Sequence, residues 1–268
     1  MTVLLLAPLV ILWLMFFAYP MVQLIIISTQ QTNFMKTVFV GLDNYINTFQ
    51  DAAFWLAVSN SLKYAAMMIP AVVIISFAMA CFISRLSKPW RNASRMVFYI
   101  PALSAGIIIA GFWKWFFHID GVVNWILGTN VSWFAQGATA LPVIAAIVVT
   151  GNLGGTLIMT LASVEAVDPG MLDAARIDGA SWGQIKRKIV LPTVSPTLAL
   201  IALLAWINAW QIIETPMMLA PQDFAATLTY HIYRQGFLFG NYGMASAQAV
   251  ILLLIIGGLA LAKRRIEK

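Results

Sequence analysis

Residues 172–192 read LDAARIDGASWGQIKRKIVLP, and this stretch determines how the rest of the chain is interpreted. It holds two Asp, two Arg and two Lys around a glycine and just before a proline. Long apolar segments lie on both sides of it. A compact charged segment in such surroundings predicts a part of the molecule that stands in water.

The local signals in this stretch predict two short helices joined by a turn. The first is expected over residues 170–178, and Gly179 suits the left-handed residue that often ends a helix. Ser181 is expected to cap a second short helix that runs to about Leu191. Pro192 then marks the return to an apolar environment. On composition alone, a solvated loop with a basic anchor is an equally good interpretation.

The composition of the chain predicts a membrane protein. Of its 268 residues, 61% are hydrophobic and only 10% are charged, with a mean hydropathy of +0.86. A soluble domain has about 25% charged residues. One span needs about 20 mostly apolar residues to cross the hydrocarbon core. The sequence therefore predicts an all-α membrane protein with a charged insert at about 164–193, and six transmembrane helices at about 3–28, 60–86, 96–117, 139–163, 194–214 and 242–262. The first is too long for the apolar part of a signal peptide and is expected to be retained.

The distribution of basic residues predicts the orientation of these spans. Twelve of the sixteen lie in the loop after the second span, the insert and the C-terminal tail: Arg85, Lys88, Arg91, Arg95, Arg176, Lys186, Arg187, Lys188, Lys263, Arg264, Arg265 and Lys268. The other four lie on the opposite side: Lys36, Lys63, Lys114 and Arg234. Cytoplasmic loops carry an excess of Lys and Arg, so the insert and both termini are expected in the cytoplasm.

Several classes of function find no support in the sequence. The net charge of +6 fits membrane orientation better than nucleic-acid binding, because no polar basic domain is present. Cys81 is the single cysteine, and His118 and His231 lack the spacing of metal ligands. A phosphate-binding G-x-x-x-x-G-K-[ST] loop and a catalytic constellation are also missing. We therefore expect no metal, no cofactor and no enzyme activity in this chain.

The charged stretch resembles the motif of the membrane subunits of binding-protein-dependent ABC importers, E-A-A-x3-G-x9-I-x-L-P. Asp173 stands in the place of the Glu, and Ile189, Leu191 and Pro192 match the end of the motif. The segments APLVILWLMFFAYPMVQ, FVGLDNYINTF and GVVNWILG are similar to those of permeases that import sugars, oligosaccharides and glycerol phosphate. The resemblance implies that the insert docks on an ATPase through Asp173, Ala174, Ala175, Arg176, Asp178, Gly179 and Ala180.

The resemblance also implies an architecture and a set of partners. It implies the type I ABC importer permease fold, with residues 1–268 as a single transmembrane permease domain in a bacterial or archaeal cytoplasmic membrane. The expected partners are a second related permease, an ATP-binding-cassette ATPase dimer that holds ATP and Mg, an extracytoplasmic solute-binding protein and membrane lipid. The aromatic outer loops suit docking of the binding protein, although an interfacial aromatic belt explains Trp125 and Trp133 equally well.

Polar and aromatic residues within the spans predict a substrate pathway. Amides and carboxylates hydrogen-bond sugar hydroxyls, and aromatic rings stack on the C–H faces of sugars. The candidates are Trp113, Asn152, Asn208, Trp210, Gln211 and Glu214. Asn208 and Gln211 are three residues apart and share a helix face, and Glu214 is expected to continue the Gln211 side. Hydrogen bonds between helices explain the amides equally well.

The leading hypothesis is a permease subunit of an ATP-driven sugar or oligosaccharide importer. A secondary transporter or channel for a small polar solute is the alternative. That alternative predicts charges in the middle of the spans for ion coupling, of which the sequence has almost none. It also leaves the insert without a role.

Overall fold

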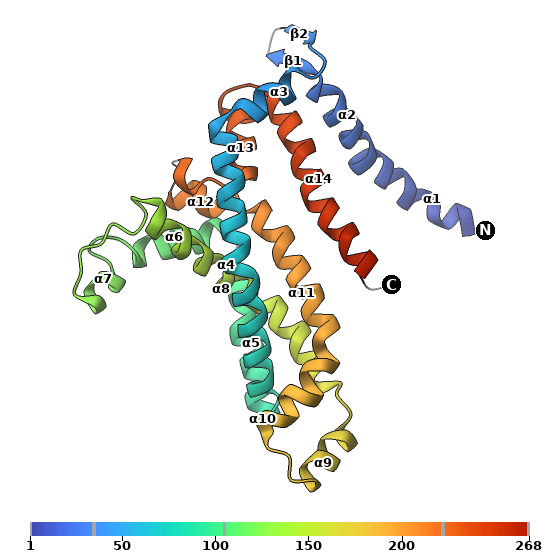
Figure 1. Cartoon of the computed structure of the whole chain (residues 1–268), viewed down its shortest axis with the longest axis vertical. Helices are drawn as coiled ribbons and strands as arrows, with labels where there is room; N and C mark the ends of the chain where they lie inside the picture. Colours follow the sequence, from blue (N-terminus) through green and yellow to red (C-terminus); the bar gives the residue numbers. More distant parts are fainter. Residues whose placement is uncertain (1, 34–35, 104–105, 221–222, 267–268) are drawn as a thin grey trace. The chain divides into compact units, whose positions relative to one another are not determined.

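The computed structural model describes residues 2–33, 36–103, 106–220 and 223–266, and the side chains of 6–32, 37–101, 106–220 and 223–258. The described chain is almost entirely helical (Figure 1). It divides into two compact units: residues 1–59 with 226–268, and residues 60–225. The expectation of one permease domain over 1–268 stays a prediction.

The first unit combines the two ends of the chain. Within it, α14 packs along α2 and α3. Its elements are α1 (Thr2–Trp13), the π-helical turn η1 (Leu14–Ala18), α2 (Tyr19–Ser28), the hairpin strands β1 (Gln30–Asn33) and β2 (Lys36–Phe39), α3 (Asp43–Gln50), the start of α4 (Ala52–Ile83), α13 (Leu228–Tyr233), the π-helical turn η4 (Arg234–Leu238) and α14 (Tyr242–Ile266).

Asn44 joins the segments of the first unit that surround the hairpin. Its Nδ2 donates to the carbonyls of Ser28 and Gln30, both at 2.9 Å. The strands pair antiparallel, with Gln30 opposite Phe39. On α14, a Cβ added to Gly243 would overlap the Gln30 carbonyl, so only glycine lets the two backbones approach this closely. The sequence indicated only a polar stretch here.

The second unit contains the insert and the long helices that lead to it. The core of this unit forms around α8, which packs along α5 and contacts α11. The elements are the rest of α4, α5 (Lys88–Leu103), α6 (Gly106–Phe116), α7 (Val122–Leu127), α8 (Gly137–Glu165), α9 (Pro169–Ile177), α10 (Trp182–Ile185), the π-helical turn η2 (Lys186–Val190), α11 (Leu191–Gln211), α12 (Glu214–Leu219) and the 3₁₀ turn η3 (Asp223–Ala225).

Four of the predicted spans are confirmed as helices long and apolar enough to cross a membrane, whereas residues 104–105 of the third lie outside the described residues. The four helices are Leu6–Ser28, Ala52–Ile83, Gly137–Glu165 and Trp182–Gln211. The third predicted span is divided between Lys88–Pro101 and Gly106–Phe116, which are bent by 90° and count as a fifth if the pair is one span. The sixth falls on α14, of which the described apolar part, Tyr242–Gly258, is a shorter helix. The total of six stays a prediction.

The end of the insert differs from the sequence expectation. Ser181 does begin a helix, but this helix does not stop near Leu191, because α10, η2 and α11 run on as one helix over Trp182–Gln211. The amide of Leu191 bonds the carbonyl of Lys186, which is the wide i→i+5 bond of a π turn. Pro192 follows this wide turn directly and has no backbone N–H to donate. The helix therefore continues through the proline. The prediction of a separate second short helix was therefore wrong.

Candidate functional site

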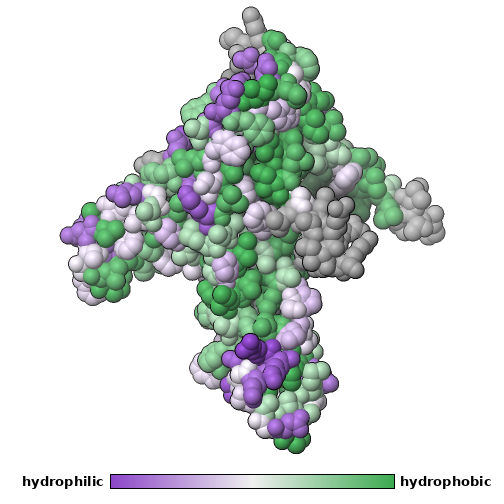
Figure 2. Space-filling view, in the orientation of Figure 1, coloured by the Kyte–Doolittle hydropathy of each residue, from purple (hydrophilic) through white to green (hydrophobic). Residues whose placement is uncertain are grey.

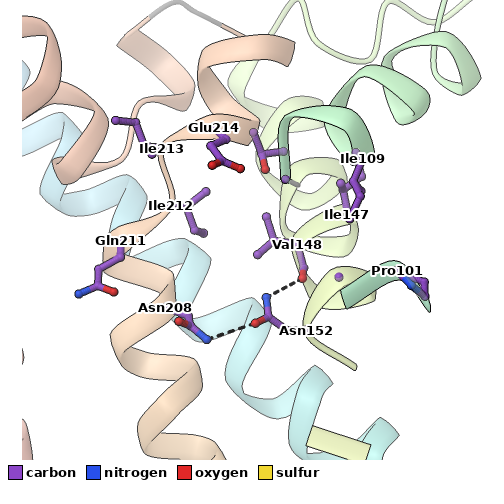
Figure 3. Close-up of a pocket in the computed structure, with 13 residues that line it drawn as sticks. Pro101, Ile109, Ile147, Val148, Asn152, Asn208, Gln211, Ile212, Ile213 and Glu214 are labelled. Atoms are coloured by element: carbon purple, nitrogen blue, oxygen red, sulfur yellow. Dashed lines mark hydrogen bonds between the residues drawn. The ribbon is translucent and has the colours of Figure 1, made fainter. Parts of the chain in front are cut away.

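The second unit contains a pocket of about 350 Å³ where the two pieces of the divided span meet α8, α11 and α12 (Figure 3). Its polar walls come from side chains on three different helices. The lining residues are Pro101, Gly106, Ile109, Ile147, Val148, Gly151, Asn152, Asn208, Gln211, Ile212, Ile213, Glu214 and Thr215. Four of the six predicted pathway residues, Asn152, Asn208, Gln211 and Glu214, are therefore brought together.

A break in the helix shapes one wall of the pocket. The helix ends at Gln211, Ile212 is extended with φ −65° and ψ 121°, and α12 begins at Glu214. The expectation that Glu214 continues the Gln211 side of one helix was therefore wrong. Pro216 gives the physical reason, because it lies in the first turn of α12, where its missing N–H needs no helical partner. Non-helical backbone at membrane depth is tolerated where it lines a cavity, and this break does so.

Asn152 and Asn208 join α8 to α11 at the pocket wall. The Asn208 Nδ2 donates to the Asn152 Oδ1 at 3.2 Å, and the Asn152 Nδ2 donates to the Val148 carbonyl at 2.8 Å. Figure 3 shows the two amides pointing toward each other. The hydrogen bond between helices confirms the packing interpretation. The same pair lines the pocket, so packing and solute contact are compatible here.

Glu214 supplies the negative charge of the pocket. Its side chain is exposed to the cavity and lies against Gly106, the first described residue of α6. A Cβ at Gly106 would overlap the Glu214 carboxylate, so the glycine makes room for it. The arrangement presents an oriented acceptor to the cavity, beside the Asn152 and Asn208 amides.

The two predicted tryptophans lie outside this lining. Trp210 is only 1% exposed, and its ring lies 5.5 Å from that of Trp206 on the same helix. Trp113 packs against the core beside Phe116 and Phe117, with ring centroids 5.7 and 5.8 Å away. Both are packing residues in this structure, so the pocket presents amides, a carboxylate and aliphatic side chains.

Sequence reasoning missed several residues that shape the pocket. Pro101 and Gly106 end and begin the two pieces of the divided span, and Thr215 lies in the first turn of α12. Pro216 was a usable signal, since a proline at the end of an apolar run predicts a helix boundary. Gly106 gave no comparable signal, because its role depends on a carboxylate more than 100 positions away in the chain.

The insert is stabilised by local hydrogen bonds at both ends of α9. The Asp168 Oδ1 accepts from the Gly170 amide at 3.0 Å and caps the start of the helix. Gly179 has φ +77°, and the amides of Gly179 and Ala180 bond the carbonyls of Arg176 and Ala175. This pair of bonds is a Schellman motif, which confirms the predicted left-handed glycine.

The next helix begins with a capping box. The Ser181 Oγ accepts from the Gln184 amide, and the Gln184 Oε1 accepts from the Ser181 amide at 2.7 Å. This confirms the predicted cap and adds its reciprocal partner. Because α9 and α10 each satisfy their own terminal groups, the turn between them has a defined geometry.

The predicted docking residues divide between two faces of the insert. Ala175 and Ala180 are half-buried against the core of the unit. The exposed members are Asp173, Ala174, Arg176, Asp178 and Gly179. Asp173 pairs with Arg176 at 2.7 Å, and both side chains are more than half exposed. Such an exposed pair contributes about 0–1 kcal/mol to stability, so it orients the two side chains more than it strengthens the fold.

An apolar residue that sequence reasoning missed completes this exposed face. Ile177 is 87% exposed, and Met171 on the same helix is 50% exposed. Figure 2 shows hydrophilic residues gathered at this end of the second unit, beside the apolar surface of the long helices. Ile177 therefore adds a large apolar side chain to an exposed face that is otherwise charged. Its signal in the sequence was the Ile between Arg176 and Asp178.

The two aromatic residues of the α7 loop have different environments. Trp133 is half-buried, and its Nε1 donates to the Asn124 Oδ1 at 3.0 Å. Asn124 also donates to the carbonyls of Ile119 and Val131, so it organises the loop. Trp125 is 82% exposed. Trp133 is therefore part of the loop structure, whereas Trp125 is free for contact with a protein or with the membrane interface.

The described residues contain no group of three or more His, Cys, Asp or Glu placed to hold a metal ion. The chemistry that the pocket offers is hydrogen bonding from three side-chain amides, Asn152, Asn208 and Gln211, and from the Glu214 carboxylate. Such groups suit hydroxyl-rich solutes. The insert offers a shaped protein-contact surface.

Comparisons with known proteins find similar chains among transport permeases. The permease protein of a sulfoquinovosyl glycerol transport system from Agrobacterium fabrum is 27% identical, over 95% of this chain and 86% of that protein. A probable permease for starch degradation products from Thermoanaerobacterium thermosulfurigenes is 25% identical, over 82% of this chain and 77% of that protein. A bacterial alginate ABC transporter, solved in complex with an alginate pentasaccharide-bound periplasmic protein, has a chain with TM-score 0.86 and 25% identity, over 98% of this chain and 94% of that one.

The likeness in fold confirms the expected permease architecture along nearly the whole chain. The family model of the binding-protein-dependent transport system inner membrane component matches residues 57–264. The match covers the pocket, the divided span and the insert. The chain therefore belongs to the family of binding-protein-dependent transport system inner membrane components.

Proposed function

We propose that this chain is the transmembrane permease subunit of an ATP-driven importer that moves a sugar or oligosaccharide from an extracytoplasmic binding protein into the cytoplasm. The observation that carries the proposal is the connection between the two sites. The continuous helix Trp182–Gln211 begins at the insert and ends in the pocket wall. A movement imposed on the insert therefore has a direct route to the residues that would contact the solute.

The chemistry of the pocket favours a saccharide. Asn152, Asn208 and Gln211 offer donors and acceptors, and Glu214 offers a charged acceptor. Sugar hydroxyls both donate and accept, so they suit this mixture. The relatives whose names describe transport of starch products and of sulfoquinovosyl glycerol support the same class of solute.

The insert favours an external source of energy. Its exposed face combines Ile177 with Asp173 and Arg176, and it lies beyond the ends of α8 and α10 (Figure 1). We assign this face to docking on an ATP-binding-cassette ATPase dimer, which would bind ATP and Mg. The chain itself then needs no cofactor and catalyses no reaction. A second related permease completes the assembly.

The charge distribution supports an orientation. The basic segments 85–95 and 176–188 lie at the same end of the second unit, where Arg85 contacts Trp182 and Arg95 pairs with Glu165. We place this end, and both chain termini, on the cytoplasmic side of a bacterial or archaeal cytoplasmic membrane, because basic residues are enriched there. The α7 loop with Trp125 then faces the binding protein.

The experiment that tests the proposal is uptake by the reconstituted complex in proteoliposomes. Labelled oligosaccharides, a labelled peptide and labelled cations are offered with and without ATP and the binding protein. We expect saccharide uptake that requires both. Uptake of a saccharide without ATP would instead support a secondary transporter or channel, and transport of the peptide or a cation alone would refute the substrate class.

A further inference from the structure

One short segment of the second unit, residues 85–95, holds the residues that flank the insert on both sides. The insert proper comprises residues 166–181, and Glu165 ends α8 directly before it. Arg95 of α5 pairs with the Glu165 Oε2 at 2.6 Å, and the Arg91 Nε lies 3.4 Å from the Glu165 Oε1. The two guanidinium groups therefore hold both oxygens of one carboxylate.

The other side of the insert is held by a cation–π contact. Trp182 is the first residue of α10, directly after the insert, and the Arg85 guanidinium lies 5.0 Å from the centroid of its ring. Arg85 belongs to the short turn between α4 and α5, and the Arg91 amide in the first turn of α5 bonds the Ser87 carbonyl of that turn. We call Arg85, Arg91, Arg95, Glu165 and Trp182 the clasp.

Two charges of the clasp, those of Glu165 and Arg91, oppose the dipoles of their own helices. Glu165 places a negative charge at the C-terminal end of α8, and Arg91 places a positive charge in the first turns of α5. Each position is unfavourable for an isolated helix, because C-terminal carbonyls repel anions and N-terminal amides repel cations. Helix stability does not explain these residues, whereas their pairing between the two helices does.

The clasp connects the insert to the divided span. The insert is covalently continuous with α8 and with the helix Trp182–Gln211, both of which reach the pocket. The helix α5 also reaches it, through Pro101, but is not adjacent to the insert in sequence. It packs along α8, and at the insert its charged contact is with Glu165. Arg95 and Pro101 are six residues apart, or about 9 Å along a helix.

We propose that the clasp makes α5 follow the insert, so that the divided span moves together with α8 and α11 when the insert is displaced. Glu165 and Trp182 are positioning residues in this mechanism, because they act on the pocket only through α5 and the turn before it. This inference rests on the proposed function. It adds residues outside the docking face that determine how completely movement of the insert reaches the cavity.

The test measures coupling in the complete reconstituted complex, as saccharide taken up per ATP hydrolysed. Glu165→Arg places a third positive charge beside Arg91 and Arg95, and we expect the ratio to fall about tenfold while ATP hydrolysis continues. Arg95→Glu alone should act similarly. The double variant Glu165→Arg/Arg95→Glu restores an opposite-charge pair and should recover most of the ratio. A purely structural defect would instead reduce the amount of assembled complex, checked by size-exclusion chromatography, and leave the uptake per ATP of the assembled fraction unchanged.

Two further variants serve as controls. Lys88→Glu makes the same charge change on α5 at a residue that is not paired with Glu165, and it should leave the ratio unchanged. Trp182→Phe keeps an aromatic face for Arg85 and should retain coupling, whereas Trp182→Ala should reduce it.

The outcomes separate the two proposals. If the wild-type complex takes up saccharide and Glu165→Arg matches it in uptake per ATP, the clasp is refuted and the proposed function stands. The clasp is also refuted if the double variant is no better than either single variant. If the wild-type complex shows no ATP-dependent saccharide uptake, the proposed function fails and the clasp proposal falls with it.

Discussion

The insert and the pocket are built in opposite ways. The insert obtains its geometry from neighbours in sequence: the Asp168 cap, the Gly179 turn and the Ser181–Gln184 capping box. The pocket obtains its geometry from residues that are distant in sequence, since Gly106 makes room for Glu214 and Asn152 bonds Asn208. A surface that must fit a partner is preorganised locally, whereas a cavity that must change shape is assembled from separable helices.

The prediction with the largest expected effect tests whether the exposed face of the insert docks a partner protein. We expect Gly179→Asp to reduce ATP-driven saccharide uptake about 100-fold in proteoliposomes while the protein remains in the membrane. A Cβ at Gly179 meets no atom within 4 Å in this chain, so the side chain would obstruct the docked partner and not the fold. An added side chain at φ +77° is strained, but Asp is among the residues that tolerate such values.

A matched control exists for this substitution. Gly128 also has a positive φ, +63°, also ends a short helix and also has open space around it. Gly128→Asp should therefore carry the same backbone strain but leave the ATPase bound to the complex, whereas Gly179→Asp should release the ATPase. If Gly179→Asp retained ATP-driven uptake, the docking role of the insert would be contradicted.

The second prediction concerns the charge in the pocket. We expect Glu214→Ala to raise the apparent KM for saccharide uptake about tenfold, because a hydrogen bond to a charged group contributes about 1.5–3 kcal/mol. The thermal unfolding midpoint should change little, since the side chain is exposed. A large loss of thermal stability with an unchanged KM would instead make Glu214 a structural residue of the α6–α12 contact.

The prediction with the smallest expected effect tests whether Gly106 determines the position of the Glu214 carboxylate in the pocket. We expect Gly106→Ala to raise the apparent KM about threefold, because the new Cβ displaces the Glu214 carboxylate but the flexible side chain can move aside. Gly111→Ala on the same helix is the control, since its Cβ has open space. The effect of Gly106→Ala should vanish in a Glu214→Ala background. An equal effect in that background would show that Gly106 acts on something other than the carboxylate.

The contrast between the locally built insert and the pocket built from distant residues explains which features the sequence could predict. The first helix of the insert, its left-handed glycine and its Ser181 cap follow from short-range rules and were predicted. The continuation through Pro192 was not, because the π turn that accommodates the proline depends on how the whole helix packs. Four of the residues that line the pocket were predicted from their polarity inside apolar spans. Trp113 and Trp210 have suitable chemistry, but only packing determines which way a side chain faces.

The clasp was missed for a related reason. Arg91 and Arg95 entered the sequence argument only as positive charges that set the membrane orientation. Their pairing with Glu165 crosses 70 positions of chain, and no local pattern indicates it. Charges placed against their helix dipole are a usable signal for such pairings once helix boundaries are known.

The π turn η2 has a consequence for the angular alignment of the pocket-lining residues. It holds one residue more than an α-helical segment would, and each residue advances a helix by about 100°. The turn therefore sets the rotational phase of everything that follows it, including Asn208. Tightening this turn to regular α geometry would twist that amide away from α8 without altering a single side chain. Five residues next to the insert therefore set the angular position of groups in the distant cavity.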